Sequence, residues 1–224
     1  MIAARHTAWA ESIFQPYLKR LFKRHFHALQ VLGEIPQIEA QFPLLLLPNH
    51  STWWDGFFIY LLNKKVFHRR TFLMMLETQL RRYPFFKYLG AFSVAPFSPA
   101  SVRAALRYTA EILKQQPPPL LCIFPQGELF PWQQRPLVYK RGVEVILQAY
   151  GEKANLLPLA MRAEFLGKHR PEVFFLFGKN QIVEAKSSFP AKQWAQIEEE
   201  LLDDLARRIL RGEQGKILLK RREA

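Results

Sequence analysis

The sequence predicts an α/β fold in a single domain, in which a largely parallel or mixed sheet is covered by helices and preceded by an N-terminal amphipathic helical segment. Short apolar runs recur along the chain, and the stretches between them carry apolar residues at the helical spacing of three and four. Strands that alternate with helices favour a parallel sheet with both faces covered. A chain of 224 residues, 49% of them apolar, can bury such a core. We expect the helical segment at 1–40 and the domain at 41–224.

The expected elements follow from the apolar runs and from the breakers between them. Strands are expected at Leu44–Leu47, Thr71–Leu76, Ala91–Ala95, Leu120–Phe124, Asn155–Met161 and Val173–Phe177. Helices are expected at Trp53–Leu62, Gln79–Tyr88, Pro99–Lys114 and Arg141–Tyr150. Phe189 and Pro190 lead into a charged helix from Ala191 to Arg211, followed by a basic end, which we expect to be solvated or, as the less favoured alternative, to contact a membrane; its cations are Lys216, Lys220, Arg221 and Arg222.

The N-terminal segment has the pattern of a basic amphipathic helix. Its apolar stripe consists of Trp9, Ile13, Phe14, Tyr17, Leu18, Leu21, Phe22, Phe26 and Leu29. Basic side chains surround the stripe: Arg5, Lys19, Arg20, Lys23, Arg24 and His27. Pro16 is expected to divide this helix or to begin its second part. Two interpretations stay open, because such a stripe can lie in the interface of an anionic bilayer or pack against the domain.

The charge balance favours an anionic partner. Lys and Arg number 32 against 19 Asp and Glu, which gives a formal net charge of +13. Membrane surfaces, nucleic acids and phosphate-rich ligands are partners of this kind. The single cysteine, Cys122, excludes an internal disulfide and is typical of a reducing cytoplasm. Because no signal peptide and no apolar run near the roughly 18 residues of a membrane span are seen, we expect a peripheral protein on the cytoplasmic face of a membrane.

The stretch Leu44 to Asp55, LLLLPNHSTWWD, contains the first candidate site. Its apolar run predicts a buried strand broken at Pro48, with His50 in the turn beyond it. One continuous helix would place His50 and Asp55 roughly 140° apart, so we expect Asp55 in the first turn of the following helix. There its carboxylate accepts from one imidazole nitrogen and leaves the other basic, as a general base requires. Alternatively, Thr52 and Asp55 form a capping box and His50 is structural.

The stretch Leu120 to Lys140, LLCIFPQGELFPWQQRPLVYK, contains the second candidate site. Another buried strand ends at Phe124 and Pro125, and Gly127 in the following turn permits a positive φ or a close approach to a ligand. If the two strands are parallel, this turn lies at the same edge of the sheet as His50. An ordinary turn between a strand and a helix is the alternative explanation.

Together the two stretches resemble motifs of the glycerolipid acyltransferase family, the lysophosphatidate-acyltransferase-like enzymes. NHSTWWD resembles the family's NHxxxxD block and FPQGE its FPEGT block, with matches at Asn49, His50, Asp55, Phe124, Pro125 and Gly127. Three further segments agree in order and interval, namely 90–94 (GAFSV), 139–142 (YKRG) and 157–159 (LPL). The resemblance covers roughly residues 40 to 165.

The resemblance implies that an acyl group moves from acyl-CoA or acyl-carrier protein to a lipid hydroxyl, with no cofactor and no metal. His50 would remove the hydroxyl proton, Asp55 would orient His50, and backbone N–H groups of the Gly127 turn or of the helix start after His50 would stabilise the oxyanion. The implied substrate-binding residues are Asn49, Gln126, Gly127, Glu128, Arg135, Lys140 and Arg141. Trp53 and Trp54 are candidates for an acyl groove or, alternatively, for the core. No metal-ligand spacing is seen at His6, His25, His27, His68 or His169.

Departures from the family pattern concern the acceptor. The family has arginines, associated with the acceptor's phosphate, at the end of its middle block and after FPEGT; here Phe97 follows the middle strand and Leu129 follows the second block. Without these two arginines, the phosphate of an acceptor such as lysophosphatidate would be poorly paired with cations. A neutral or zwitterionic lipid hydroxyl therefore fits Gln126 and Glu128 better than lysophosphatidate does. The cations still available to a phosphate are Arg103, Arg135, Lys140 and Arg141.

Two other functions stay open. Residues 81–88 (RRYPFFKY) mix cations with aromatics, which suits a bilayer interface but also nucleic-acid bases, although no helix-turn-helix, zinc or RNA-recognition pattern accompanies them. The second alternative is a membrane-bound lipid-binding relative that kept the fold and lost the chemistry. Substitution of His50 separates the three functions: acyl transfer vanishes, membrane binding stays, and nucleic-acid binding also survives but falls steeply with salt.

Overall fold

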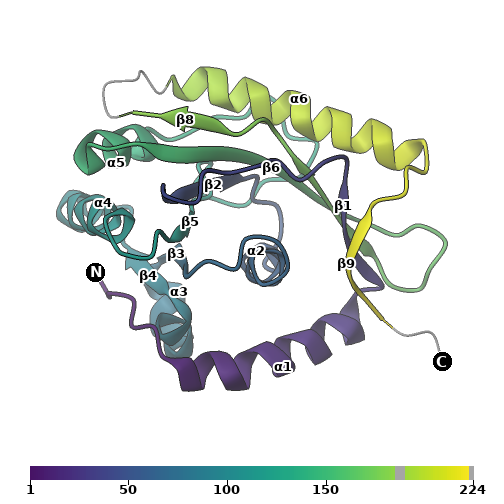
Figure 1. The fold of residues 1–224 in the computed structure, drawn as a ribbon, viewed down its shortest axis with the longest axis horizontal. Coiled ribbons are helices and arrows are strands. Elements are labelled where there is room, and N and C mark those ends of the chain that lie inside the picture. The colour runs from purple at the N-terminus through teal and green to yellow at the C-terminus, as the bar shows by residue number, and fades with distance from the viewer. Residues whose placement is uncertain (185–189, 222–224) are drawn as a thin grey trace.

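Nine strands form one sheet within residues 1–184 and 190–221, the parts of the chain that the computed structural model describes (Figure 1). They are β1 (Ala28–Leu32), β2 (Leu44–Pro48), β3 (Thr71–Leu76), β4 (Ala91–Val94), β5 (Leu120–Cys122), β6 (Ala154–Glu164), β7 (Glu172–Phe177), β8 (Gln181–Val183) and β9 (Lys216–Lys220). Their order is β4-β3-β5-β2-β6-β7-β1-β9, and β8 pairs with β6 beside this path. Phe189 and Arg222, which the sequence analysis placed beside the last helix and in the basic end, lie outside the described residues.

The sheet is mixed. Its neighbouring strands β4, β3, β5, β2 and β6 run parallel, whereas β7 and β8 are antiparallel to β6 and β9 is antiparallel to β1. The carboxyl ends of β4, β3, β5 and β2 therefore meet at one edge. The loops after β2 and β5, which belong to the two candidate stretches, lie at this edge, where ligands of parallel sheets bind.

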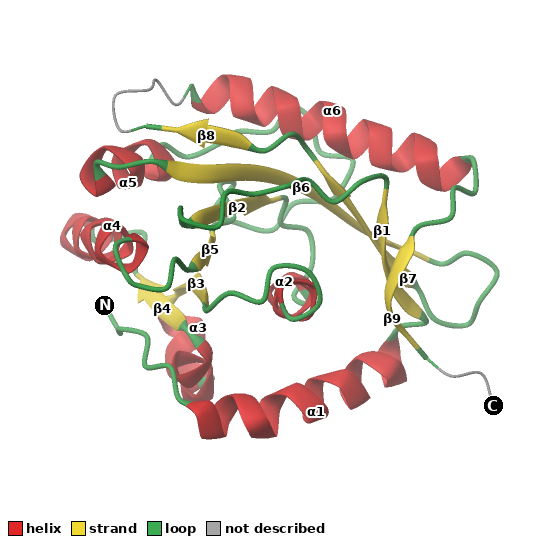
Figure 2. Ribbon diagram, viewed as in Figure 1, coloured by secondary structure: helices red, strands yellow, loops and turns green. Residues whose placement is uncertain are grey.

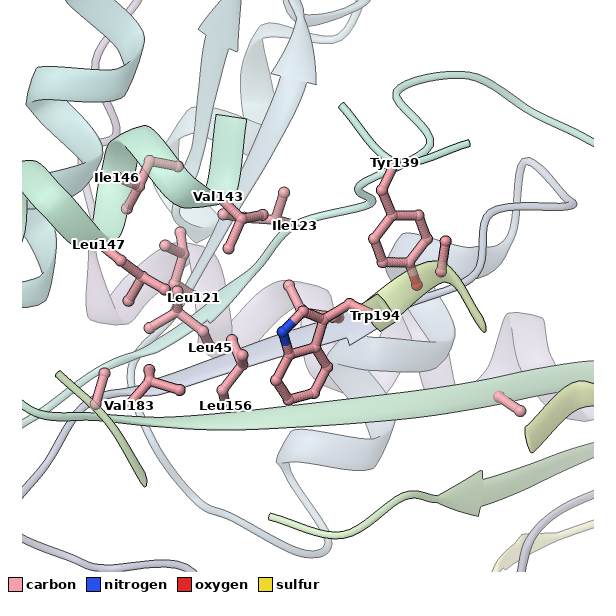
Figure 3. Close-up of a cluster of buried hydrophobic side chains, with 14 of the residues drawn as sticks. Leu45, Leu121, Ile123, Tyr139, Val143, Ile146, Leu147, Leu156, Val183 and Trp194 are labelled. Carbon is pink, nitrogen blue, oxygen red and sulfur yellow. The ribbon is translucent and has the colours of Figure 1, made fainter. Parts of the chain in front are cut away.

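Helices cover both faces of the sheet (Figures 1 and 2). On one face lie α1 (Ala8–His25) and α2 (Asp55–Asn63), and on the other lie α4 (Pro99–Leu113), α5 (Gly142–Tyr150) and α6 (Ala191–Leu210). The short α3 (Glu77–Arg82) and the 3-10 helix η1 (Pro84–Leu89) connect β3 to β4. Each face has its own apolar cluster, because alternate residues of a strand point to opposite sides. Figure 3 shows the cluster on the α5 and α6 side, and the predicted α/β class is confirmed.

The helix α1 runs without interruption through Pro16, so the prediction that Pro16 divides it or begins a second part is wrong. Pro16 is exposed, whereas Ala10, Phe14, Leu18 and Phe22 are buried on both sides of it. Burial of this stripe offsets the roughly 3 kcal/mol that a proline costs inside a helix. No helix among the described residues combines the length and the apolar character that a membrane span requires.

The stripe does not extend to Phe26 and Leu29, because α1 ends at His25 and residues 28–32 form β1. All five residues of β1 are buried, and a short buried run fits a strand and a helix equally well. The 1–40 segment therefore contributes a strand to the sheet as well as a helix. The end of the chain, expected to be solvated, contributes β9, which pairs with β1.

The helix expected at Gln79–Tyr88 is divided into α3 and η1. The division falls at Tyr83, with φ −124° and ψ 66°, because Pro84 disfavours the helical conformation of the residue before it. The strand β8 was also not expected.

Candidate active site

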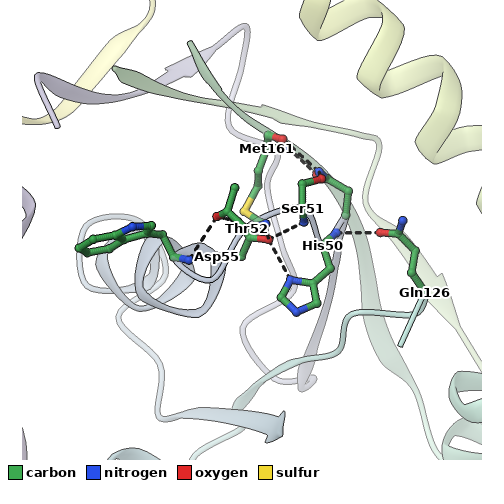
Figure 4. Close-up of polar contacts among 8 residues, drawn as sticks. His50, Ser51, Thr52, Asp55, Gln126 and Met161 are labelled. Atoms are coloured by element: carbon green, nitrogen blue, oxygen red, sulfur yellow. Dashed lines mark hydrogen bonds and ion pairs between the residues drawn. The ribbon is translucent and has the colours of Figure 1, made fainter. Parts of the chain in front are cut away.

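His50 and Asp55 form a hydrogen-bonded pair at the carboxyl end of β2 (Figure 4). His50 lies in the turn after the strand, and Asp55 is the first residue of α2. Nδ1 of His50 lies 2.8 Å from Oδ2 of Asp55. Because a carboxylate only accepts hydrogen bonds, Nδ1 carries the hydrogen and Nε2 of the neutral ring is left as a base. The placement predicted from the spacing is confirmed, although the helix begins at Asp55 rather than at Trp53.

The Asp55 carboxylate also closes the turn that leads into α2. The backbone N–H groups of Ser51 and Thr52 donate to Oδ2 at 2.7 and 2.9 Å, and the Thr52 hydroxyl donates to Oδ1 at 2.5 Å. Asp55 is only 3% exposed, so these donors replace the water that the carboxylate lost on burial. The two interpretations of Asp55 are therefore compatible, because the same carboxylate binds the imidazole and the turn.

The His50 ring is held on a second side by Phe124. The two rings are stacked, with centroids 4.0 Å apart and an interplanar angle of 19°. Asp55 fixes one edge of the imidazole and Phe124 covers one of its faces, so the ring has a defined orientation. The side chain keeps 24% of its surface exposed, which leaves it accessible to a substrate.

The backbone of His50 is bound by the second stretch. Its N–H donates to Oε1 of Gln126 at 2.7 Å, and its carbonyl oxygen accepts from the N–H of Phe130 at 2.9 Å. The parallel pairing of β2 with β5, which places Leu46 opposite Cys122, brings these groups together. The two candidate stretches are thus joined by hydrogen bonds.

Asn49 and Gln126 occupy supporting positions rather than the substrate-facing positions that the sequence predicted. Both side chains are buried. Asn49 exchanges two hydrogen bonds with the backbone of Met161 in β6, at 2.7 and 3.1 Å, and so fixes the end of β2 to the neighbouring strand. Both side chains thus make their hydrogen bonds to protein groups.

The Gly127 turn has the expected left-handed conformation, with φ +76°. Its N–H donates to the carbonyl oxygen of Phe124 at 3.0 Å, and the helix-start amides of Ser51 and Thr52 are bound to Asp55. These three N–H groups already have protein acceptors, so the expectation of an oxyanion donor in these two segments stays a prediction for their other N–H groups. A Cβ at position 127 would lie 2.8 Å from Cδ and Nζ of Lys140, so Lys140 lies directly against the turn. Its ammonium is 4.0 Å from the Glu128 carboxylate, and both side chains are exposed.

The other two cations predicted to bind substrate are bound to protein groups. The Arg135 guanidinium donates to the carbonyl oxygens of Trp132 and Gln134 and to Asp203 of α6, the last at 2.6 Å. Arg141 pairs with Glu144 at 2.8 Å and is largely exposed. Of the three predicted cations, Lys140 is therefore the one placed against the Gly127 turn.

Large apolar side chains are exposed in the loops after the parallel strands. They are Trp53 after β2, Leu76 at the end of β3, Phe97 after β4 and Leu129 after β5. Phe97 is 99% exposed, whereas Trp54 is partly buried against Phe26. Two hollows, of about 500 and 570 Å³, are lined by residues that precede these strands, at the opposite end of the sheet, and do not belong to a site at His50.

The apolar stripe of α1 is divided between the core and the surface. Phe14, Leu18 and Phe22 pack in the cluster that contains α2, which confirms packing against the domain for this part of the stripe. Trp9, Ile13 and Tyr17 are exposed and recur every four residues, so they share one outer side of the helix. Arg20 and Arg24 continue that side toward the end of α1 and are exposed as well.

The model of the acyltransferase family matches residues 29–162, which contain both candidate stretches. This chain belongs to the acyltransferase family. Its fold is similar to that of the 1-acyl-sn-glycerophosphate (LPA) acyltransferase PlsC from Thermotoga maritima, with a TM-score of 0.55 and 18% identity over 88% of this chain and 78% of that chain. No curated protein matches the chain. The family resemblance inferred from the sequence motifs is thus confirmed.

Two features of this acyltransferase do not follow from the sequence patterns described above. The stacking of His50 on Phe124 depends on strand register, which the sequence does not reveal. Glu198 of α6 is completely buried although it is ionisable. The sequence does carry a signal for Glu198, since it lies at helical spacing in the apolar row Trp194, Ala195, Leu202, Leu205 and Ile209.

Proposed function

We propose that this chain is an O-acyltransferase that moves a fatty acyl group from acyl-CoA or acyl-carrier protein to a lipid hydroxyl, with His50 as general base and Asp55 as its orienting partner. The observation that carries the proposal is the 2.8 Å contact between Nδ1 and the buried carboxylate, at the ligand-binding edge of an acyltransferase-family fold. In a neutral ring fixed in this way, Nε2 is the nitrogen that can take a proton.

The reaction follows from that basic nitrogen. Nε2 of His50 takes the proton of the acceptor hydroxyl while the hydroxyl oxygen bonds to the carbonyl carbon of the thioester. The carbon–sulfur bond then breaks, and the departing sulfur recovers the proton from His50. The protein needs no nucleophile of its own, because the acceptor supplies the attacking oxygen.

The groups around His50 support this role by fixing the imidazole. Phe124 limits rotation of the ring, while Gln126 and Phe130 bind the backbone of the same residue on both sides. Asn49 joins the preceding residue to β6. Positioning of this kind matters because a displacement of about 1 Å at a reacting group costs on the order of 10²-fold in rate.

For the acceptor, we propose a neutral or zwitterionic lipid hydroxyl rather than lysophosphatidate. Where the family resemblance expects phosphate-binding arginines, Pro96, Phe97 and Ser98 follow the middle strand and Leu129 follows the second block. The side chains of Phe97 and Leu129 are exposed. Lys140 lies against the Gly127 turn, but the Glu128 carboxylate 4.0 Å away offsets part of its charge. Incubation with lysophosphatidate and neutral hydroxylated lipids side by side tests this point, and rapid turnover of lysophosphatidate alone would refute it.

For the location, we propose peripheral binding to the cytoplasmic face of a membrane through the outer side of α1. Trp9, Ile13 and Tyr17 supply exposed apolar surface, and Arg20 and Arg24 supply charge for anionic headgroups. Aromatic and basic side chains together favour the interface of an anionic bilayer.

The deciding experiment compares wild-type protein with His50→Ala. Each is incubated with acyl-CoA, first without an acceptor and then with a total lipid extract from the native membrane, and thiol release is followed together with product mass. The control is His169→Ala, which removes an exposed histidine from a loop. Release that requires both the extract and His50 supports the proposal, and the product mass identifies the acceptor.

The remaining outcomes separate the alternatives. If no thiol is released, the assay is repeated with acyl-carrier protein as donor. Failure with both donors would favour a lipid-binding relative that kept only the fold. Equal release by wild type and His50→Ala would overturn the assignment of His50 as the base. Salt-sensitive binding of nucleic acid that survives His50→Ala would favour a nucleic-acid-binding protein.

A further inference from the structure

The helix α6 buries a carboxyl group in the middle of its apolar face. Trp194, Leu202 and Leu205 of this face pack into the apolar cluster on one side of the sheet, and Figure 3 shows Trp194 and Tyr139 in that cluster. Glu198 lies between Trp194 and Leu202 at steps of four and has no exposed surface. Neither of its carboxyl oxygens has a hydrogen-bond partner among the described residues. A buried polar group without a partner is uncommon and requires a physical explanation.

Glu198 lies on the α6 side of the turn that contains His50. The backbone amides of Asn49 and Leu159 are close enough to favour its ionised form, without a hydrogen bond of normal geometry. Asn49 directly precedes His50, and Leu159 lies opposite Pro48 in the pairing of β6 with β2. Glu198 therefore approaches the end of β2 from the α6 face of the sheet, whereas α2, which begins with Asp55, packs on the other face.

The surroundings of Glu198 keep it neutral near pH 7. Desolvation raises the pKa of its carboxyl group to about 8, although the amides of Asn49 and Leu159 and the Arg135 guanidinium act in the opposite direction. The neighbouring Tyr139 stays neutral too, because burial, followed by the charges of Glu198 and Glu199, raises the pKa of its hydroxyl well above the ordinary value. A neutral carboxyl group can donate one hydrogen bond and accept others.

Two neighbouring carboxylates of α6 hold the loop after β5. Glu199 accepts from the backbone N–H of Leu137, and Asp203 accepts from Arg135. Further along, Lys140 closes this loop through a backbone bond to Pro125. Consecutive turns of α6 thus reach both candidate stretches, although α6 lies outside the region 29–162 that the family model matches.

We propose that Glu198 is a positioning residue for acyl transfer, which supports the Asn49–His50 turn from the α6 face of the sheet. This inference rests on the proposed function, since it concerns the rate of that reaction. Glu198 does not touch the reacting atoms and acts through the backbone of Asn49. A polar group in this place can keep the turn fixed directly or through a buried water, whereas an apolar side chain of similar size cannot.

Three variants test the role. Glu198→Gln keeps a neutral side chain that donates and accepts, Glu198→Leu fills the space without polar atoms, and Glu200→Gln removes an exposed carboxylate from the same helix as a matched control. We expect Glu198→Leu to lower kcat by about 10- to 100-fold with little change in KM for the acyl donor. Glu198→Gln and Glu200→Gln are expected to stay within about twofold of wild type at pH 7, so that the conservative variant restores the rate.

The dependence of kcat on pH, compared between wild type and Glu198→Gln, is a second readout. It does not require Glu198→Leu to fold. Above about pH 8 the wild-type carboxyl group ionises. The carboxylate has lost the hydrogen that it could donate and is a charge inside an apolar cluster, which disturbs the packing on the α6 side of the turn. We therefore expect kcat to fall there in wild type but not in Glu198→Gln. Wild-type kcat in folded Glu198→Leu, or the same alkaline decline in wild type and Glu198→Gln, would overturn the positioning role. A wild-type protein without activity on either donor would instead contradict the proposed function.

Discussion

Replacement of Glu198 by glutamine should change how the stability of the protein depends on pH. The pKa of this carboxyl group rises from 4.5, its ordinary value, to about 8 on folding because of burial. Between these values the folded state keeps a proton that the unfolded state has released. The favourable contribution of this retained proton to the free energy of unfolding is therefore complete below pH 4.5 and is lost as pH rises through 8. The free energy of unfolding falls by about 1.36 kcal/mol per pH unit in this window.

From pH 5 to pH 7.5 this carboxyl group thus lowers the stability of the wild type by roughly 3 kcal/mol, and Glu198→Gln lacks the effect. Urea unfolding of wild type, Glu198→Gln and Glu200→Gln at several pH values measures it. Groups that titrate alike in wild type and variant cancel in the difference, and the exposed Glu200 controls for the loss of one charge. A difference between wild type and Glu198→Gln that stays constant from pH 5 to pH 7.5 would refute the reasoning.

Three further predictions concern catalysis, acceptor choice and membrane binding. Asp55→Asn should lower kcat by about 10²-fold or more, because His50 loses its carboxylate partner. Steady-state kinetics measures this on variant protein whose circular dichroism spectrum matches that of the wild type. An unchanged kcat would contradict the prediction. Leu129→Arg should raise kcat/KM for lysophosphatidate about tenfold relative to a neutral lipid, since the new guanidinium can form a charge-assisted hydrogen bond with the phosphate. Assays in which the two lipids compete measure this ratio, with Leu129→Gln as the control. A ratio of kcat/KM values that stays as in the wild type would count against a neutral acceptor. Ile13→Glu should weaken binding to anionic vesicles by tenfold or more, as apolar burial is lost; equal weakening by Ser12→Glu in flotation assays would show that charge alone is responsible.

The sequence predicts a secondary-structure element correctly where its residues fit only one periodicity, and it fails where they fit both a helix and a strand. The run Leu44–Leu47 is four residues long and is closed by Pro48, so its length and its breaker favour a strand over a helix. Phe26, just after α1, and Leu29 of β1 continue the helical spacing of α1, and nothing local shows that the chain changes direction at His27. The continuity of α1 through Pro16 has a similar cause, since it depends on burial against α2, a tertiary effect that overrides local propensity.

The candidate site divides in the same way. His50 and Asp55 are five residues apart, so the turn and helix geometry alone bring them together. The contact of His50 with Gln126 joins residues 76 positions apart and depends on how β2 and β5 are aligned. Glu198 is further away still in the sequence, and its position depends on the packing of α6 over this face of the sheet.

The role of Gln126 changes what its departure from the family pattern means. The FPEGT block has glutamate here, so the glutamine first counted as a sign of an uncharged acceptor. The amide is instead buried and accepts from the backbone of His50, whose ring is bound by the Asp55 carboxylate. A second buried carboxylate bound to the same residue would be costly, whereas a neutral acceptor is sufficient for an N–H donor. Gln126 therefore bears on the positioning of His50, and the proposal of a neutral acceptor depends on the exposed Phe97 and Leu129.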